Sequence, residues 1–514
     1  MKRKLVAPVL ILTATFAPLA QLGPTLAVER KPVNSDFNGD GYSDMAVGAP
    51  GYSYAVDQSG EVNVLYGGPS GVSSQADQLW RPDSPGLNWG SEAIPYSLFG
   101  EETAIADFNG DGFADLAIGS PRAEQVNVLY GSADGLTTVG DQRWRGSSPG
   151  LAEPLYTPYA LGGILTTGDF NGDGFAELAM GVVDNADESG RPGYVRVLYG
   201  SASGLATEGN QLWTEGTPGL KGVPPPNDND ISWAGELAAG DFGKGGEDDL
   251  AISEAGNRGG YVHVLYGSIG TGLSVRDDQL WSLDSWGVPG QSMDSARFGG
   301  SLAVGDFGGA KPGFEDLAIG VIGLRRASGA LVVLYARKDG LVGKDSQIWT
   351  QDTFGVEDEA EPNDLFGGPL AAGDFNADGH DDLAIGVTGE DTAVTSDAGA
   401  VSVLYASYCW PSGFVLCATG DELWTLDTQG VPGRGESLDG FGRSLASGDF
   451  GAGGAEDLVI GIPQRDVGGS SDAGAVAVIY GSSRLEGLTS AASQLWTQES
   501  AGVKGQPRQQ DYFG

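Results

Sequence analysis

The chain has 514 residues with 69 acidic and 28 basic side chains, and its formal net charge of −41 argues against a nucleic-acid backbone or an anionic membrane surface as a partner. Glycine accounts for 86 residues while hydrophobic residues still make up 40%, a composition that excludes global disorder and predicts many short strands joined by turns. At this length several domains or a repeat array are expected, and cations are the natural partners of so acidic a surface.

The amino terminus has the organisation of a secretory signal peptide. A basic start over residues 2–4 precedes an apolar run over 5–20, and residues 25–27 offer a cleavage site of small residues. The apolar run contains two prolines and is short for a membrane-spanning helix, although an anchor helix or a buried first strand is the alternative. We therefore predict a signal peptide over residues 1–27, a mature domain over 28–514 and a secreted, extracellular protein without membrane insertion.

A repeat of about 70 residues organises the mature chain. Each unit contains an Asp-Phe pair, then a strand-like run that closes on Tyr, such as VNVLY, and then a segment resembling DQLW. The tryptophans that end these segments are Trp80, Trp144, Trp213, Trp281, Trp349, Trp424 and Trp496. Seven units therefore account for the mature chain.

Each unit reads as four short strands joined by turns. Four antiparallel strands cannot bury both of their faces alone, but stacking such sheets around an axis buries them. We therefore predict an all-β protein, a seven-bladed β-propeller of four-stranded antiparallel blades, with an open solenoid as the alternative array. The predicted blades run approximately over 28–80, 99–144, 161–213, 233–281, 298–349, 366–424 and 441–496.

The two ends of the chain indicate how the ring closes. Six units carry an aromatic or apolar residue eight positions before the Asp of the Asp-Phe pair, and in four of these the residue is Phe followed by Gly. The first unit lacks this feature, whereas the chain ends on Phe513-Gly514 with no unit behind it. We predict that residues 511–514 complete the first blade and lock the ring.

Four of the turns after the Asp-Phe pairs have the spacing of a metal-binding loop, D-x-N-x-D-G-x-x-D/E. We call them loops 1, 2, 3 and 6, after their repeat units. Side chains at positions 1, 3, 5 and 9 are Asp36, Asn38, Asp40 and Asp44; Asp107, Asn109, Asp111 and Asp115; Asp169, Asn171, Asp173 and Glu177; and Asp374, Asn376, Asp378 and Asp382. The backbone carbonyls at position 7 belong to Tyr42, Phe113, Phe175 and His380. Several hard oxygen ligands on a tightly curled loop favour Ca²⁺, at about four sites. A solvated turn rich in Asp and Asn is the alternative.

The other three turns have lost the central ligands. Loop 4 (241–249), loop 5 (306–316) and loop 7 (449–457) keep the first and last Asp but have Gly in place of Asn at position 3, and loop 5 is two residues longer. We expect no tightly bound ion there. Lys244 and Lys311 could supply local positive charge, or could simply be exposed.

The two cysteines, Cys409 and Cys417, lie eight positions apart in what reads as an enlarged turn between two strands. In an exported chain this spacing favours a local disulfide, with two buried thiols as the alternative. Such a bridge would staple one loop only.

The ordered combination of Phe-Gly, then D-x-N-x-D-G-x-x-D-L, then Gly48-Ala49-Pro50 resembles the FG-GAP repeat of integrin alpha-chain propellers and their secreted bacterial relatives. The resemblance covers essentially all of the mature chain. It implies seven blades with Ca²⁺ in the hairpin between the first and second strands of a blade, on the lower face. It also implies that a ligand engages loops on the opposite face.

No catalytic residues are predicted. The two histidines lie in a strand (His263) and in loop 6 (His380), and both are expected to be structural. The G-x-S-x-G spelling at 146–150 belongs to a turn that recurs after the Trp strands, so it does not indicate a nucleophile elbow.

We therefore predict a calcium-stabilised binding or adhesion module that acts as a monomer and binds a protein or glycan. The candidate binding loops are the irregular segments 182–193, 214–232, 350–365 and 388–398. The alternative is a calcium-dependent extracellular carbohydrate-active or lipolytic enzyme.

Overall fold

The computed structural model describes residues 35–51, 59–90, 96–151, 161–183, 193–222, 231–256, 259–309, 313–392, 395–409, 413–451, 453–482 and 486–514. The chain separates into two units, Met1–Pro32 and Val33–Gly514, and the described residues all lie in the second. The signal peptide predicted at 1–27 lies outside the described residues.

Seven antiparallel sheets make up the second unit. The first three contain β1 (Met45–Ala49), β2 (Glu61–Tyr66) and β3 (Ser73–Trp80); β4 (Thr103–Ala106), β5 (Asp115–Ser120), β6 (Gln125–Tyr130) and β7 (Thr137–Arg145); and β8 (Ile164–Gly168), β9 (Glu177–Val182), β10 (Tyr194–Tyr199) and β11 (Ala206–Thr214). The next two contain β12 (Ile231–Gly240), β13 (Asp249–Gly256), β14 (Tyr261–Tyr266) and β15 (Ser274–Trp281); and β16 (Phe298–Gly305), β17 (Asp316–Val321), β18 (Leu331–Arg337) and β19 (Gly340–Trp349). The last two contain β20 (Leu370–Gly373), β21 (Asp382–Val387), β22 (Ala400–Cys409) and β23 (Gly413–Trp424); and β24 (Leu445–Gly448), β25 (Asp457–Ile462), β26 (Ala475–Ser482) and β27 (Gly487–Trp496). Two single turns, η1 (Pro121–Ala123) and α1 (Leu324–Ala327), are the helical elements of the described chain.

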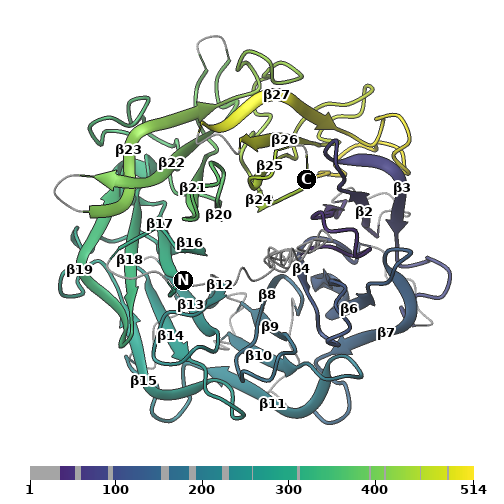
Figure 1. Ribbon diagram of the computed structural model, residues 1–514, viewed down its shortest axis with the longest axis horizontal. Helices are drawn as coiled ribbons and strands as arrows, with labels where there is room; N and C mark the ends of the chain where they lie inside the picture. Colours follow the sequence, from purple (N-terminus) through teal and green to yellow (C-terminus); the bar gives the residue numbers. More distant parts are fainter. Residues whose placement is uncertain are drawn as a thin grey trace, which may run out of the picture. The chain divides into compact units, whose positions relative to one another are not determined.

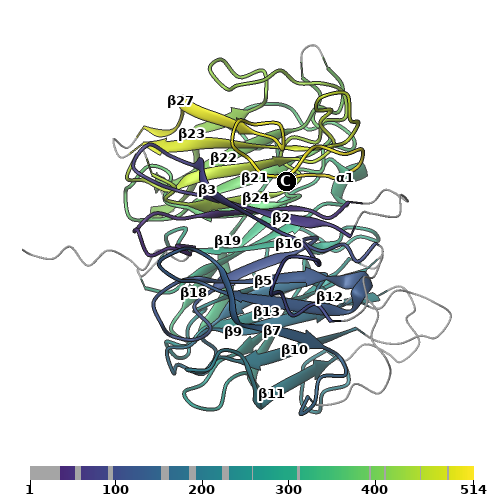
Figure 2. The same ribbon diagram turned by 90° about the vertical axis from the view of Figure 1, so that its right-hand side faces the viewer.

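The sheets follow one another around a common axis, with the first strand of each blade nearest the centre and the Trp strand at the rim (Figure 1). A view turned by 90° shows the blades from the side of this ring (Figure 2). The prediction of an all-β, seven-bladed propeller with four-stranded antiparallel blades is confirmed. Within the described residues the first sheet has three strands, and a cavity of about 1040 Å³ lies along the inner edge of β1, between β4 and β24.

The burial pattern explains why the sequence forms these strands. In the second blade, the second and third strands β5 and β6 are buried at every position because a neighbouring blade covers each face. The rim strand β7 is partly exposed along its whole length. The Phe of each Asp-Phe pair is buried between blades, and six of the seven are fully inaccessible: Phe37, Phe108, Phe170, Phe242, Phe307 and Phe375. Burying one such ring contributes roughly 1.5–3 kcal/mol.

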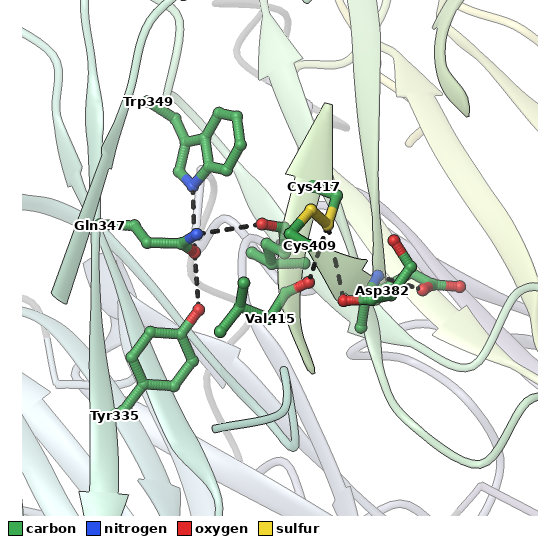
Figure 3. Close-up of a disulfide and its surroundings, with 10 residues drawn as sticks. Tyr335, Gln347, Trp349, Asp382, Cys409, Val415 and Cys417 are labelled. Carbon is green, nitrogen blue, oxygen red and sulfur yellow. Dashed lines mark hydrogen bonds between the residues drawn. A yellow bond between two sulfur atoms is a disulfide. The ribbon is translucent and has the colours of Figure 1, made fainter. Parts of the chain in front are cut away.

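A side-chain latch joins six of the seven blades to the next, and Figure 3 shows the one at Gln347. Tyr335 donates a hydrogen bond to Gln347 Oε1 at 2.6 Å, and Gln347 Nε2 donates to the Leu416 carbonyl of the following blade at 3.0 Å. The same latch links Tyr66, Gln78 and Leu136; Tyr130, Gln142 and Leu205; Tyr199, Gln211 and Leu273; Tyr266, Gln279 and Leu341; and Tyr480, Gln494 and Val72. The glutamine of the DQLW segment is therefore an interblade residue.

The carboxyl terminus closes the ring. Phe513 forms a parallel bridge with Gly474 in the seventh blade, as Phe99 does with Gly60 and Phe366 with Gly329. Its ring is fully buried and packs in a cluster with residues of the first and last blades. The prediction that the terminal Phe-Gly closes the propeller is confirmed.

The hairpin of β22 and β23 carries the two cysteines. Cys409 and Cys417 are joined by a disulfide that crosses this hairpin (Figure 3). The bridge spans eight positions, so it constrains one hairpin and leaves the closure of the ring to packing and hydrogen bonds.

Candidate metal centres

The predicted ligands lie in the turns between the first and second strands of their blades. Loop 2 joins β4 to β5, loop 3 joins β8 to β9 and loop 6 joins β20 to β21, while loop 1 leads into β1. A glycine at position 6 makes the bend in each loop; in Gly112, for example, φ is +90°. These turns therefore place four similar sets of oxygen atoms at one end of the blades.

Loops 1 and 2 are held by their own backbone amides. In loop 1, Asp36 Oδ1 accepts from Gly39 N at 2.6 Å and Asp36 Oδ2 accepts from Gly41 N at 2.8 Å. Asn38 Oδ1 accepts from Asp40 N at 2.8 Å. Loop 2 has the same pattern, with Asp107 and Asn109 as acceptors. The side chains that would bind an ion thus also shape the turn.

Loops 3 and 6 hold the position-3 asparagine differently. Asn171 and Asn376 are buried, with 8% and 7% of their surface exposed, and in both the Oδ1 atom has no hydrogen-bond partner. A buried amide oxygen without a partner is costly, and a cation would satisfy it. In loop 3, carboxylate oxygens of Asp169, Asp173 and Glu177 also lie within 4.8 Å of one another, the one such acidic group among the described residues. The donor set of hard oxygens fits Ca²⁺.

The position-7 residue of loop 6 lies between two blades. His380 donates its backbone N–H to Asp378 Oδ1 at 3.0 Å, as Tyr42, Phe113 and Phe175 donate to the position-5 residues of their own loops. Its ring packs against Phe414 with a centroid separation of 4.2 Å, and its Nδ1 lies 3.6 Å from Asp306 Oδ2 in loop 5. The side chain of His380 therefore contacts the neighbouring loop, while its carbonyl remains the candidate ligand.

The last carboxylate of every loop has a structural role that the sequence pattern did not reveal. Asp44 accepts from Phe37 N at 2.8 Å and from Gly67 N at 3.0 Å, so it ties the loop to the end of the third strand. Asp457 in loop 7 accepts equivalent bonds from Phe450 N and Gly481 N, both at 2.9 Å. These carboxylates are at most 2% exposed: Asp44, Asp115, Glu177, Asp249, Asp316, Asp382 and Asp457. Conservation of this acid between the repeat units therefore does not by itself indicate an ion.

Burial also makes these carboxyl groups hard to ionise. Burial raises the pKa of Asp44 to about 8, that of Asp115 to about 7 and that of Asp382 to about 9, although the backbone amides partly offset the effect. The nearby carboxylates at positions 1 and 5 raise the pKa further. A divalent cation at the centre of the loop would favour the ionised form of all three acids.

Backbone hydrogen bonds join all seven loops into a ring. The next-to-last amide of each loop donates to the carbonyl of the first Asp in the preceding loop, for example Ala114 N to Asp36 O at 2.9 Å. Ser43 N donates to Asp449 O at 2.7 Å and completes the ring between the last and first blades. The remaining bonds run from Ala176 to Asp107, Asp248 to Asp169, Glu315 to Asp241, Asp381 to Asp306 and Glu456 to Asp374. An ion bound in one loop would therefore also fix the first Asp of that loop, whose carbonyl accepts a hydrogen bond from the next loop.

At position 3, loops 1, 2, 3 and 6 have Asn, whereas loops 4, 5 and 7 have a glycine that lies against the following blade. Their position-3 residues are Gly243, Gly308 and Gly451, and a Cβ atom at each would collide with a backbone carbonyl of the next blade. In loop 4, Lys244 N donates to the Lys338 carbonyl at 3.1 Å and Lys244 Nζ lies 3.6 Å from the centre of the Tyr266 ring. Lys311 lies outside the described residues. The missing Asn therefore has a steric cause.

Comparisons with known proteins agree with this architecture. Residues 32–65, 99–130, 161–198 and 366–404 match the FG-GAP repeat, and these segments contain loops 1, 2, 3 and 6. The chain is 32% identical to phosphatidylinositol-glycan-specific phospholipase D of Bos taurus over 172 residues, 33% of this chain and 20% of that protein. It is 30% identical to integrin alpha-6 of Homo sapiens over 154 residues, 29% of this chain and 12% of that protein. It is 28% identical to integrin alpha pat-2 of Caenorhabditis briggsae over 369 residues, 62% of this chain and 28% of that protein.

The chain thus carries FG-GAP repeats and resembles the propeller of integrin alpha chains, as the sequence motifs predicted. It spans about a fifth of the length of the phospholipase D relatives that it matches. Among the described residues, no helix has the length and apolar character needed to cross a bilayer.

Proposed function

We propose that this FG-GAP propeller is a secreted, calcium-stabilised module that binds a protein or a glycan through loops of its blades. The similarity to integrin alpha chains supports a binding role. The observation that carries the proposal is a pair of exposed aromatic side chains on rigid turns, Trp286 and Phe354, which are 83% and 100% exposed. Large aromatic side chains are favoured anchors of binding interfaces.

The two turns that present these rings are well ordered by hydrogen bonds. In the turn after β15, Ser282 N donates to Ser285 Oγ at 2.9 Å and Val288 N donates to the Ser285 carbonyl at 3.1 Å. The turn after β19 repeats this arrangement around Thr350 and Thr353. Because the backbone is already fixed, binding a partner would cost little conformational entropy there.

The other blades have no aromatic residue at the turn position of Trp286 and Phe354. It is occupied by Pro85, Pro149, Pro218, Gln429 and Ala501. At this turn position, exposed aromatic rings are therefore found in the fourth and fifth blades, and the segment 350–365 that contains Phe354 is one of the binding loops predicted from the sequence. We place the ligand-binding surface on these two blades.

Ca²⁺ would be held by the side chains at positions 1, 3, 5 and 9 of loops 1, 2, 3 and 6 and by the position-7 carbonyls. The ion would neutralise carboxylates that converge between strands and would hold the blade junctions rigid. The binding loops would then be presented on a fixed frame. This role is structural and needs no ion at the ligand surface.

An enzymatic role is the second candidate, because a phospholipase D is among the relatives. Of the two histidines, His263 is 1% exposed and lies 3.0 Å from the Glu254 carboxylate, which leaves it inaccessible to a substrate. His380 packs against Phe414 within the ring of loops. His263 is thus inaccessible and the His380 ring is held against the neighbouring blade, so we favour the binding role.

The proposal is tested by screening the purified chain, saturated with Ca²⁺, against panels of glycans and extracellular-matrix proteins. Trp286→Ala and Phe354→Ala should each weaken binding at least tenfold without changing the melting temperature. Gln429→Ala, at the same turn position of the sixth blade, is the matched control and should bind as the wild type does. Equal binding by all three variants would exclude this surface, and hydrolysis of a glycosylphosphatidylinositol substrate would favour the enzyme.

A further inference from the structure

Loop 3 differs from the other candidate metal loops in how completely its oxygen atoms are assembled. Among the described residues, it alone has three carboxylate groups that already converge, and the buried Oδ1 of its Asn171 has no hydrogen-bond partner. Asn171 Nδ2 donates to Glu177 Oε1 at 3.5 Å, so the amide lies beside these carboxylates. A buried oxygen without a donor, next to converging carboxylates, is best satisfied by a cation.

The fourth blade packs directly against loop 3. Gly270 N donates to the Asn171 carbonyl at 2.7 Å, so a turn of that blade fixes the residue that carries the unpartnered oxygen. Asp248 holds the first acid of the loop twice, because its N–H donates to the Asp169 carbonyl at 3.0 Å and its Oδ2 accepts from Asp169 N at 2.8 Å. Residues of the fourth blade therefore form part of the surroundings of this site.

Glu247 is the acid of the fourth blade that lies against the bend of loop 3. It is 9% exposed, and a Cβ atom placed on Gly172, at position 4 of loop 3, would lie 3.0 Å from Glu247 Cγ and 3.5 Å from its Oε1. The other oxygen, Oε2, accepts from Gly246 N at 3.3 Å within loop 4. Glu247 Oε1 is therefore the oxygen on the side of loop 3.

No described base neutralises this carboxylate. Glu247 forms no ion pair among the described residues, where the bases of the fourth blade pair with other acids. Lys244, which belongs to the same loop as Glu247, places its Nζ 3.6 Å from the centre of the Tyr266 ring. A buried carboxylate without a counter-charge requires a cation from solution or a proton.

An aromatic ring makes the equivalent contact in loops 1 and 2. Gly39 of loop 1 lies against Phe113, and Gly110 of loop 2 lies against Phe175. Phe113, Phe175 and Glu247 all stand at position 7 of the loop that follows, two residues before its last acid. The same place beside a metal loop is therefore apolar at loops 1 and 2 and carries a carboxylate at loop 3.

We propose that Glu247 of the fourth blade raises the Ca²⁺ affinity of loop 3 and makes it the tightest of the four ion sites. The inference rests on the proposed binding of Ca²⁺ by these loops. The affinity of a Ca²⁺ site is set by the charge around the ion and by the rigidity of the loop, and Glu247 adds a carboxylate to a loop that the fourth blade already fixes. Position 7 of loop 7, which follows loop 6, is Ala455 and adds no charge.

The test measures each loop separately. Crystals of the full chain are soaked in a series of limiting Tb³⁺ concentrations, and the anomalous peaks at loops 1, 2 and 3 are compared within each crystal. The wild type should fill loop 3 first. Glu247→Gln removes the charge with little change of shape. It should raise the concentration that half-fills loop 3 by roughly threefold to tenfold, the effect of one charge on a nearby cation at a partly screened surface, and leave loop 2 unchanged.

The reciprocal change places the acid beside loop 1. Phe113→Glu should lower the Tb³⁺ concentration that half-fills loop 1 by a similar factor, whereas Phe113→Gln, the matched control, should not. The backbone carbonyl of Phe113 in loop 2 is retained in both variants. Failure of Phe113→Glu to strengthen loop 1, in crystals in which its side chain lies against Gly39, would count against an effect of charge at this place.

A solution measurement separates the charge of Glu247 from a structural role. In a chelator, Glu247→Gln should melt no lower than the wild type because it loses a buried unpaired charge, whereas in Ca²⁺ it should melt lower. Isothermal titration with Ca²⁺ should show that the difference in affinity between the two proteins shrinks at high salt. An equal loss of melting temperature with and without Ca²⁺ would show a structural role and would overturn the proposal.

The crystal titration also distinguishes this inference from the proposed calcium sites on which it rests. If loop 3 fills at the same concentration in the wild type and in Glu247→Gln, the role of Glu247 is wrong while the ion site stands. If loop 3 of the wild type stays empty at every concentration, both are wrong.

Discussion

Gly514 donates a backbone hydrogen bond to the carbonyl of Gly48 at 3.0 Å. Gly100 makes the same bond to Gly119, also at 3.0 Å, at the equivalent corner of the second blade. Gly514 therefore occupies in the first blade the position that the glycine of the Phe-Gly pair, Gly100, occupies in the second blade. Residues far apart in sequence thus meet at a junction that is built like those inside the chain.

The closing corner should contribute as much stability as an internal one. Phe513 and Phe99 are both fully buried, and truncating a buried Phe typically costs about 3–5 kcal/mol. We expect Phe513→Ala and Phe99→Ala to lower the free energy of unfolding by similar amounts, measured by urea denaturation in Ca²⁺. Deleting residues 511–514 should also lower the melting temperature. An unchanged melt after either change at the carboxyl terminus would refute closure by this corner.

Loop 3 should be the most informative single ion site, because its three carboxylates already converge. We expect Asp173→Ala to remove one Ca²⁺ ion, as measured by isothermal titration, and to lower the melting temperature in Ca²⁺. In a chelator its melting temperature should differ little from that of the wild type, because no ion is present to lose. Lys244→Ala in loop 4 is the control and should leave the number of ions unchanged. Loss of no ion from the loop 3 variant would contradict the assignment.

Restoring Asn in a loop without the full ligand set should fail to create an ion site. At Gly243, φ is +102° and a Cβ atom would collide with the Arg337 carbonyl. Gly243→Asn should therefore destabilise the fold by more than about 1 kcal/mol, the order of cost of a left-handed backbone for a residue with a Cβ. Gly246→Ala, in the same loop, meets open space and should be close to neutral. A new Ca²⁺ site in Gly243→Asn would show that the steric explanation is wrong.

Stability in excess Ca²⁺ should fall as the pH rises from about 5 to 8. Burial raises the pKa of Asp249 in loop 4 and of Asp457 in loop 7 to about 8, far above the usual value for Asp. Because a raised pKa in the folded state favours the protonated form, the stability that it contributes is present at low pH and is lost as the pH approaches 8. Each carboxyl should contribute a loss on the order of 1 kcal/mol for each pH unit over this range.

The measurement is the urea midpoint at several pH values, with Asp457→Asn as the comparison. That variant has no carboxyl to ionise at this position and should show a shallower dependence on pH, even though it is less stable throughout. A midpoint that rises with pH in the wild type would show that these carboxylates are ionised and stabilised by their backbone amides.

The sequence predicted the number of blades, the closing Phe-Gly and the positions of the seven loops because each rests on a repeated local pattern. Contacts between blades were harder to predict, since they join residues from different units. Gln347 lies in a repeated segment, but its bond to Leu416 joins it to the next blade, so the pattern within one unit does not contain it. The same holds for the last acid of each loop, whose bonds to two backbone amides depend on the third strand.

The sequence shows which loops have lost the Asn at position 3 and the Asp at position 5, but it does not show the reason for the loss. Gly451 lies against the first blade because the ring closes, and no local pattern contains that contact. Exposure of Trp286 was likewise not predictable, because most tryptophans of the repeat end a strand and pack at the rim.

We expect the closed ring of seven blades to hold Ca²⁺ in the four loops that retain their full ligand sets. The most direct measurement is a crystal structure of the full chain grown in millimolar Ca²⁺, with anomalous scattering used to locate the ions. An ion is expected in each of the loops that begin at Asp36, Asp107, Asp169 and Asp374, and none in those that begin at Asp241, Asp306 and Asp449. Four empty loops under these conditions would contradict it.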